Sequence, residues 1–166
     1  MRDLSRLVLA LALVGAVTLG LNWPAGAWAQ AVKFKRCLNT AELQVEQLVR
    51  HGVYMREAAR RCTEYKPGTD NKWKDFDQKF GVRLKQQTDR RAKLFAREFK
   101  DNALKVRTYF DGRLVTYHRN FPISIHYCEN IDDNLDEVLK RGWGGFTQQA
   151  KVLENEVLQD YKACAN

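Results

Sequence analysis

Apolar residues recur at alternating steps of four and three along most of this chain, and this spacing restricts its fold more than any other feature. The first such stretch follows Asn39, which forms a capping-box-like pair with Glu42, and it ends before the Pro67-Gly68 turn. Its apolar seam consists of Ala41, Val45, Leu48, Gly52, Met55, Ala59 and Cys62. Because residues three and four apart share one helical face, the seam predicts an amphipathic helix over about residues 40–64.

A second seam begins after Thr69 and Asp70 and is rich in aromatic residues. It thins at a polar middle, and Gly81 marks a candidate kink. Its members are Trp73, Phe76, Phe80, Leu84, Phe95, Phe99, Ala103, Val106 and Phe110. Large aromatic side chains are the strongest core fillers, so we expect this stripe to form core rather than a ligand site.

Residues 106–121 fit two patterns. Asp111-Gly112 between β-branched and aromatic residues indicates a β-hairpin. The helical seam, however, continues in phase through Phe110, Leu114, Tyr117 and Phe121. A lone hairpin in a helical domain would need further strands to pair with, so we favour a helix that ends at Pro122.

The last seam begins near Asn130 and continues to the C-terminus. It contains Gly142, Gly144 and Gly145, which either break the helix or allow a neighbouring helix to approach closely. Because the apolar phase is unbroken across Gly142, we favour one long, kinked helix. The chain is thus predicted to be all-α, an elongated up-down-up bundle of three long helices, or of four if it breaks at Gly142, forming a single domain over residues 30–166.

Four cysteines, Cys37, Cys62, Cys128 and Cys164, lie far apart in the sequence, and in an exported chain they predict two disulfides. A helix over 40–64 separates Cys37 from Cys62 by roughly 35 Å, which excludes a bond between them. In the three-helix bundle we predict Cys37–Cys128 and Cys62–Cys164. A break at Gly142 would favour Cys37–Cys164 instead.

The first 29 residues have the composition of a secretory signal peptide. Arg2 and Arg6 make the start basic, residues 7–21 are uncharged and apolar, and Ala27-Trp28-Ala29 is a cleavage site. These parts predict export, to the periplasm or beyond, as a soluble protein after cleavage before Gln30. An uncleaved anchor is the alternative, but a spanning helix needs roughly 20 apolar residues.

The chain is basic, with 28 Lys and Arg against 20 Asp and Glu, and the charge is uneven. Residues 83–119 hold eleven basic and four acidic residues, whereas residues 120–166 hold four and eight. Either neighbouring helices complement one another within the fold, or a basic face binds an anionic partner. The candidate binding face interleaves cations with tyrosines: Arg90, Arg91, Arg97, Lys100, Lys105, Arg107, Tyr109, Arg113, Tyr117 and Arg119.

No catalytic, cofactor or metal-binding motif is present in the sequence. His51 and Met55 are one helical turn apart, a spacing that suits a ligand pair, but Met55 falls on the apolar seam and we assign it to the core. His118 and His126 flank an aromatic segment without a nearby acid. The acidic cluster of Glu129, Asp132, Asp133, Asp136 and Glu137 has helical spacing, which favours a solvated face over a calcium site or a catalytic pair.

We therefore expect a non-enzymatic extracytoplasmic interaction protein that binds an anionic envelope surface or an acidic protein. This expectation includes peripheral contact with the membrane surface. Because the chain is predicted to be exported, we do not expect it to bind nucleic acid. An envelope enzyme, such as a cell-wall hydrolase with carboxylates from distant positions, is the first alternative. A metal or haem carrier is the second.

Overall fold

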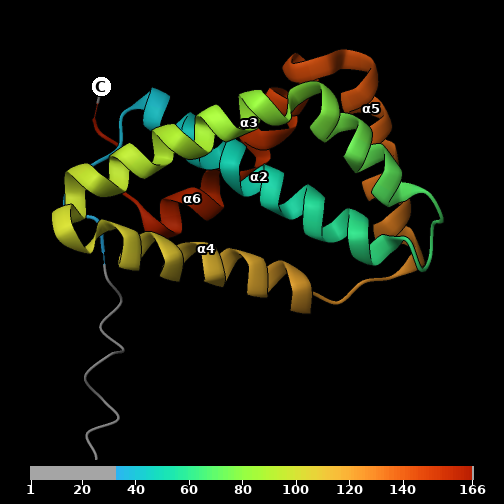
Figure 1. Cartoon of the computed structure of the whole chain (residues 1–166), viewed down its shortest axis with the longest axis horizontal. Helices are drawn as coiled ribbons and strands as arrows, with labels where there is room; N and C mark the ends of the chain where they lie inside the picture. The colour runs from blue at the N-terminus through green and yellow to red at the C-terminus, as the bar shows by residue number, and fades with distance from the viewer. Residues whose placement is uncertain (1–32, 166) are drawn as a thin grey trace, which may run out of the picture. The chain divides into compact units, whose positions relative to one another are not determined.

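The apolar seams fold into helices in the computed structural model, which describes residues 33–165 (Figure 1). The helices are α2 Thr40–Cys62, α3 Thr69–Phe99, α4 Ala103–Asn120, α5 Ile125–Ala150 and α6 Glu154–Asp160, with 3-10 turns at Lys100–Asn102 and Lys151–Leu153. The predicted all-α bundle with two disulfides is confirmed. The predicted signal peptide, residues 1–29, lies outside the described residues.

The start of α2 is fixed by the capping box that the sequence predicts. Asn39 Oδ1 accepts a hydrogen bond from the Glu42 backbone N–H, and Glu42 Oε2 accepts one from the Asn39 backbone N–H, both at 3.0 Å. Two amide groups that a helix start leaves unpaired are thereby satisfied. Further along, Gly52 allows α2 to approach α3 closely, because a Cβ there would lie 2.8 Å from Leu84 Cδ2.

The second apolar seam is divided between two helices. α3 continues through Gly81, the candidate kink, and ends at Phe99, after which Lys100 has a φ of 47° and the chain reverses. Figure 1 shows α4 returning in the direction opposite to α3, and the two helices pack together. Residues 103–120 are helical, so the helix predicted across Asp111-Gly112 is confirmed and the hairpin is excluded.

The predicted continuity of the final helix is wrong, because α5 is interrupted at Gly142. The φ of 67° and ψ of −155° of this residue belong to a region that glycine adopts far more readily than other residues. After the break, the C-terminal segment returns to the start of the described chain. Leu38 N donates to Lys162 O at 2.8 Å, and Cys164 N donates to Leu38 O at 2.9 Å.

The disulfides join Cys37 to Cys164 and Cys62 to Cys128, with Cα atoms 4.9 Å and 5.2 Å apart. The predicted pairs Cys37–Cys128 and Cys62–Cys164 are therefore wrong, and the exclusion of Cys37–Cys62 is confirmed. The cause is the interruption at Gly142, which gives the pairing expected from a broken final helix.

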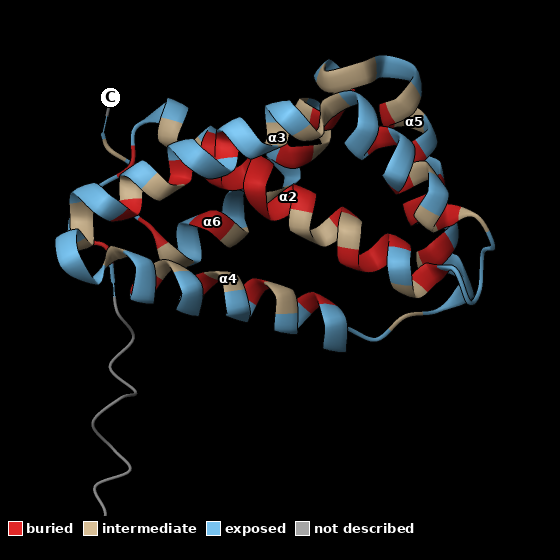
Figure 2. Ribbon diagram, in the orientation of Figure 1, coloured by how far each residue is buried: buried red, intermediate tan, exposed pale blue. Residues whose placement is uncertain are grey.

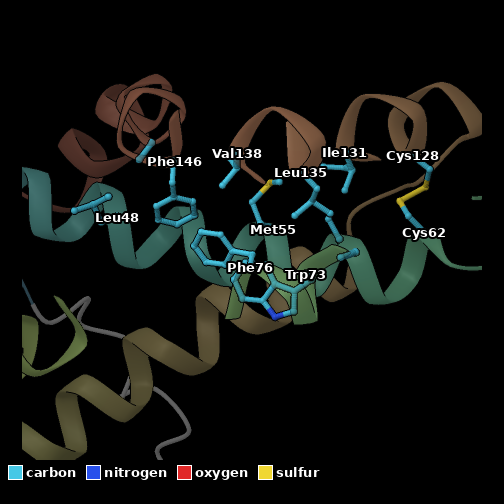
Figure 3. Close-up of a cluster of buried hydrophobic side chains, with 13 residues drawn as sticks. Leu48, Met55, Cys62, Trp73, Phe76, Cys128, Ile131, Leu135, Val138 and Phe146 are labelled. Atoms are coloured by element: carbon cyan, nitrogen blue, oxygen red, sulfur yellow. A yellow bond between two sulfur atoms is a disulfide. The ribbon is translucent and has the colours of Figure 1, made fainter. Parts of the chain in front are cut away.

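Two clusters of buried apolar side chains form the core. Figure 2 colours the buried positions of the helices red. The larger joins α2, α3 and α5 around Met55 and Phe76 (Figure 3). The smaller joins Phe34 of the N-terminal segment, Phe95 of α3 and Tyr161, which follows α6. The aromatic stripe of the second seam is thus mostly core. None of the helices within residues 33–165 is long and apolar enough to cross a membrane.

Candidate interaction surface

The structure divides the predicted binding face between two helices and the turn that joins them. Arg90, Arg91 and Arg97 belong to α3, Lys100 lies in the turn, and the remaining six residues belong to α4. These groups differ in exposure and in how their charge is balanced.

Arg91 is buried, with 1% of its surface exposed, and it does not belong to a binding face. Its Nε donates to Glu46 Oε1 at 2.8 Å, and its Nη1 donates to Asp111 Oδ1. Arg91 precedes Phe95 by four residues and shares the buried face of α3 with it. The assignment of Arg91 to the binding face is therefore wrong, because its side chain is buried on the core-facing side of α3.

The arginines of α4 are balanced by carboxylates of the same fold. Each pairs with an acidic side chain within 4.0 Å: Arg107 with Asp111, Arg113 with Asp160, and Arg119 with Glu57. Lys105 also interacts within the fold. In α4, the basic residues therefore complement acidic residues of neighbouring elements within the fold, which is one of the two explanations that the sequence allows.

A groove of about 830 Å³ is lined by α4 and α6, and the half-exposed Tyr109 and Tyr117 lie along its α4 side. The buried Arg50 of α2 also lines it and donates to Glu156 Oε1 at 3.2 Å and to Asp160 Oδ2 at 2.6 Å. The positive charge of Arg50 is thus used to hold α6 against α2. The groove presents aromatic surface but little net charge.

The exposed side of α3 carries a row of mostly cationic residues, which we call the α3 ridge. At 100° per residue its members fall within a strip roughly 80° wide. They are Lys79, Arg83, Gln86, Arg90, Lys93 and Arg97, and all are exposed. Figure 2 shows exposed residues recurring along α3. At 1.5 Å per residue, the ridge is about 27 Å long.

Most of the positive charge on the α3 ridge is not balanced within the fold. Among residues 33–165, no carboxylate forms an ion pair with Lys79, Arg83, Arg90 or Lys93, whereas Arg97 pairs with Glu42. The Arg83 guanidinium lies 4.8 Å from the centroid of the Trp143 ring, a contact that leaves its charge in place. The α3 ridge therefore differs from α4 in keeping cations available to a partner.

Lys79, Arg83 and Lys93 were missed by the sequence-based prediction, although their spacing is visible in the sequence. That prediction followed the density of cations along the chain, whereas steps of four and three select the cations that share one helical face. Lys100 follows the last residue of α3, and its φ of 47° removes it from the helical period.

The histidines show ordinary core and surface environments. His51 is 3% exposed, its Nε2 donates to Gln149 Oε1 at 3.3 Å, and burial lowers its pKa to about 4. Met55 lies in the larger apolar cluster, where the sequence placed it. His118 is buried in α4, whereas His126 is exposed near Glu129.

The acidic cluster of α5 is partly neutralised by a lysine of α3. Carboxylate oxygens of Asp132, Asp133 and Asp136 lie within 4.8 Å of one another, and Lys72 Nζ lies 2.8 Å from Asp132 and 2.6 Å from Asp136. Burial acts to raise the pKa of Asp132, but hydrogen bonds from Lys72 and Thr69 and the positive charges of Lys72 and Lys66 together outweigh burial and lower the pKa. A general acid needs a raised pKa, so Asp132 is poorly suited to that role.

No protein-family model, curated protein or solved structure matches this chain. The fold and surface themselves define a disulfide-bonded helical bundle with a cationic ridge on one helix.

Proposed function

We propose that this chain is a non-enzymatic interaction protein of the extracytoplasmic space, which binds an anionic component of the cell envelope through the α3 ridge. The observation that carries the proposal is the contrast between two helices. The arginines of α4 pair with carboxylates of the fold, whereas four cations of α3 form no ion pair with a carboxylate of residues 33–165: Lys79, Arg83, Arg90 and Lys93. Like charges at helical spacing destabilise a helix slightly, so a row that is kept without counter-charges supports a role in binding.

Export would bring this surface to anionic partners. Residues 1–29 have the three parts of a secretory signal. The disulfides Cys37–Cys164 and Cys62–Cys128 are compatible with an oxidising compartment. Lipid head groups, charged envelope polymers and acidic proteins are the anionic surfaces available there, and each attracts a row of cations over a Debye length of about 10 Å.

Sedimentation with purified cell envelopes tests the proposal. The purified protein is mixed with envelopes at low salt, and the bound fraction is measured as the salt concentration is raised. The variant K79Q/R90Q/K93Q removes three cations of the α3 ridge, and Gln preserves helix propensity. We expect the wild-type protein to sediment at low salt and to be released by salt, and the variant to stay in the supernatant.

The matched control is K140Q/K151Q/K162Q, which removes the same net charge from exposed positions on α5 and the C-terminal segment. We expect this variant to sediment like the wild-type protein. Equal loss of sedimentation in both variants would assign binding to net charge and contradict a specific role of the ridge, as would a wild-type protein that fails to sediment.

A further inference from the structure

The α3 ridge is a single file of charges on an uninterrupted helix. α3 runs from Thr69 to Phe99, and no residue within it has a positive φ. Successive ridge positions are therefore about 4.5 to 6 Å apart along the axis. The α3 ridge is several charged groups long but only one charged group wide. Such a narrow row suits contact with a linear polymer better than contact with a flat surface.

One end of the α3 ridge is defined by an acidic residue. Asp75 is exposed and precedes Lys79 by four residues, so it lies in the same strip of α3 and ends the positive row. A negative charge at this position would repel an anionic chain that extended further along the helix.

Further cations lie beside the C-terminal end of α3. The segment at residues 33–36 is held against α3 by Phe34, whose ring centroid lies 5.0 Å from that of Phe95. The backbone N–H of Lys35 donates to Glu98 Oε1 at 2.6 Å. Lys33, Lys35 and Arg36 are exposed, so this segment adds cations beside the last turn of α3.

The α3 ridge lacks the groups that a bilayer or a nucleic acid would engage. A helix that lies in a membrane buries a whole apolar face in it, but the apolar face of α3 packs in the core, and Val82 is its one exposed large apolar residue within residues 33–165. Proteins that bind single-stranded nucleic acid stack the bases on aromatic side chains. The aromatic residues of α3 are buried or half-buried, from Trp73 to Phe99.

We propose that the partner of the α3 ridge is a linear anionic polymer without aromatic groups, such as an acidic polysaccharide or a polyol phosphate, lying along α3. This inference rests on the proposed function and names the class of its ligand. A chain of closely spaced anions condenses counterions, and a row of cations that displaces them gains free energy from their release. Affinity should then grow with polymer length until the polymer spans the ridge, about 27 Å.

Linear polyphosphate of defined lengths serves as the probe, with orthophosphate as the shortest member. Binding is measured by fluorescence anisotropy at low salt. We expect the affinity to rise with polymer length up to about 27 Å and to rise only slowly beyond it. The variant K79Q/R90Q/K93Q should bind polyphosphate more weakly than the wild-type protein, by on the order of 10-fold. The variant D75K, which extends the row by one cation, should bind tighter than the wild-type protein and gain most from the longest chains.

Vesicles with anionic lipid and an oligothymidine form the comparison arms. Binding to vesicles that depends on the α3 ridge, without length dependence on polyphosphate, would overturn the linear polymer while the proposed function stands. Tighter binding of oligothymidine than of polyphosphate of equal charge would also overturn it. If no probe binds the protein and the protein does not sediment with envelopes, both the linear polymer and the proposed function are contradicted.

Discussion

Arg91 Nε lies 2.8 Å from Glu46 Oε1, and both side chains are 1% exposed, so α2 and α3 share a charge pair in the interior of the bundle. Burial acts to lower the pKa of Arg91, but the negative charges around it, that of Glu46 foremost, and its hydrogen bond to Asp111 together outweigh burial and raise the pKa. The next residue, Arg90, is exposed on the α3 ridge. Two adjacent arginines therefore serve different purposes, one in stability and one in the proposed binding.

Arg91→Ala should destabilise the protein by about 3–5 kcal/mol, because it breaks a buried charge pair and leaves Glu46 with Arg50 alone, whose Nε lies 3.6 Å from Glu46 Oε2. Arg90→Ala should change the free energy of unfolding by no more than about 0.5 kcal/mol while weakening envelope binding. Urea unfolding and envelope sedimentation of both variants measure these effects. If Arg91→Ala unfolds at the wild-type urea concentration, the interior pair is not as described.

Peptide mapping without reduction should recover Cys37 joined to Cys164 and Cys62 joined to Cys128. Replacing either pair by serines should cost about 4–5 kcal/mol, since the bonds close loops with sequence separations of 127 and 66 residues. Recovery of a peptide that joins Cys37 to Cys128 would contradict the return of the C-terminal segment.

Gly142→Ala should destabilise the protein by about 1–3 kcal/mol, because the backbone at this residue has a conformation that favours glycine. A Cβ there would lie 3.5 Å from Phe80 Cζ, an ordinary contact, so strain rather than a clash is the cause. Gly144→Ala is the matched control, since its Cβ would meet no atom within 4 Å. The control should be neutral or stabilising by up to about 1 kcal/mol, and thermal unfolding of both variants distinguishes the two sites.

His51 should make stability fall as the solution is acidified. Burial lowers its folded-state pKa to about 4 from 6.5, so the unfolded chain binds a proton that the folded chain does not between these values. The contribution is fully present above pH 6.5 and is lost as the pH falls towards 4, by about 2 kcal/mol between pH 7.5 and 5. Burial also lowers the pKa of His118, with the same sign.

Urea unfolding of His51→Gln at several pH values isolates the contribution of His51. The slope of unfolding free energy against pH should flatten in this variant between pH 7.5 and 5. An unchanged slope in His51→Gln would show that His51 is not the buried neutral group described here.

The helices could be predicted from the sequence because apolar spacing and capping are local signals. The turn at Lys100 could not, since the apolar phase of Phe99, Ala103 and Val106 continues across it. Nor could the interruption at Gly142, whose neighbours Val138 and Phe146 keep the same phase and both lie in the larger cluster. The spacing of apolar residues predicts which residues face the core, but it does not predict where the chain reverses direction.

The candidate surface shows the same division between local and long-range information. The spacing of the α3 ridge is present in the sequence, and the prediction missed three of its five cations by following charge density. The pairing of Arg113 with Asp160 and the burial of Arg91 against Glu46 arise from contacts between distant segments. These contacts decide which cations remain available, and no local pattern shows them.

The salt dependence of polyphosphate binding tests the central claim, that the α3 ridge is the binding surface, most directly. The logarithm of the binding constant should fall with the logarithm of salt concentration with a slope of about −3 for the four cations without a counter-charge among the described residues, at roughly −0.7 for each. K79Q/R90Q/K93Q should reduce this slope to about −1, and K140Q/K151Q/K162Q should leave it unchanged. Equal slopes for the wild-type protein and the ridge variant would contradict the account.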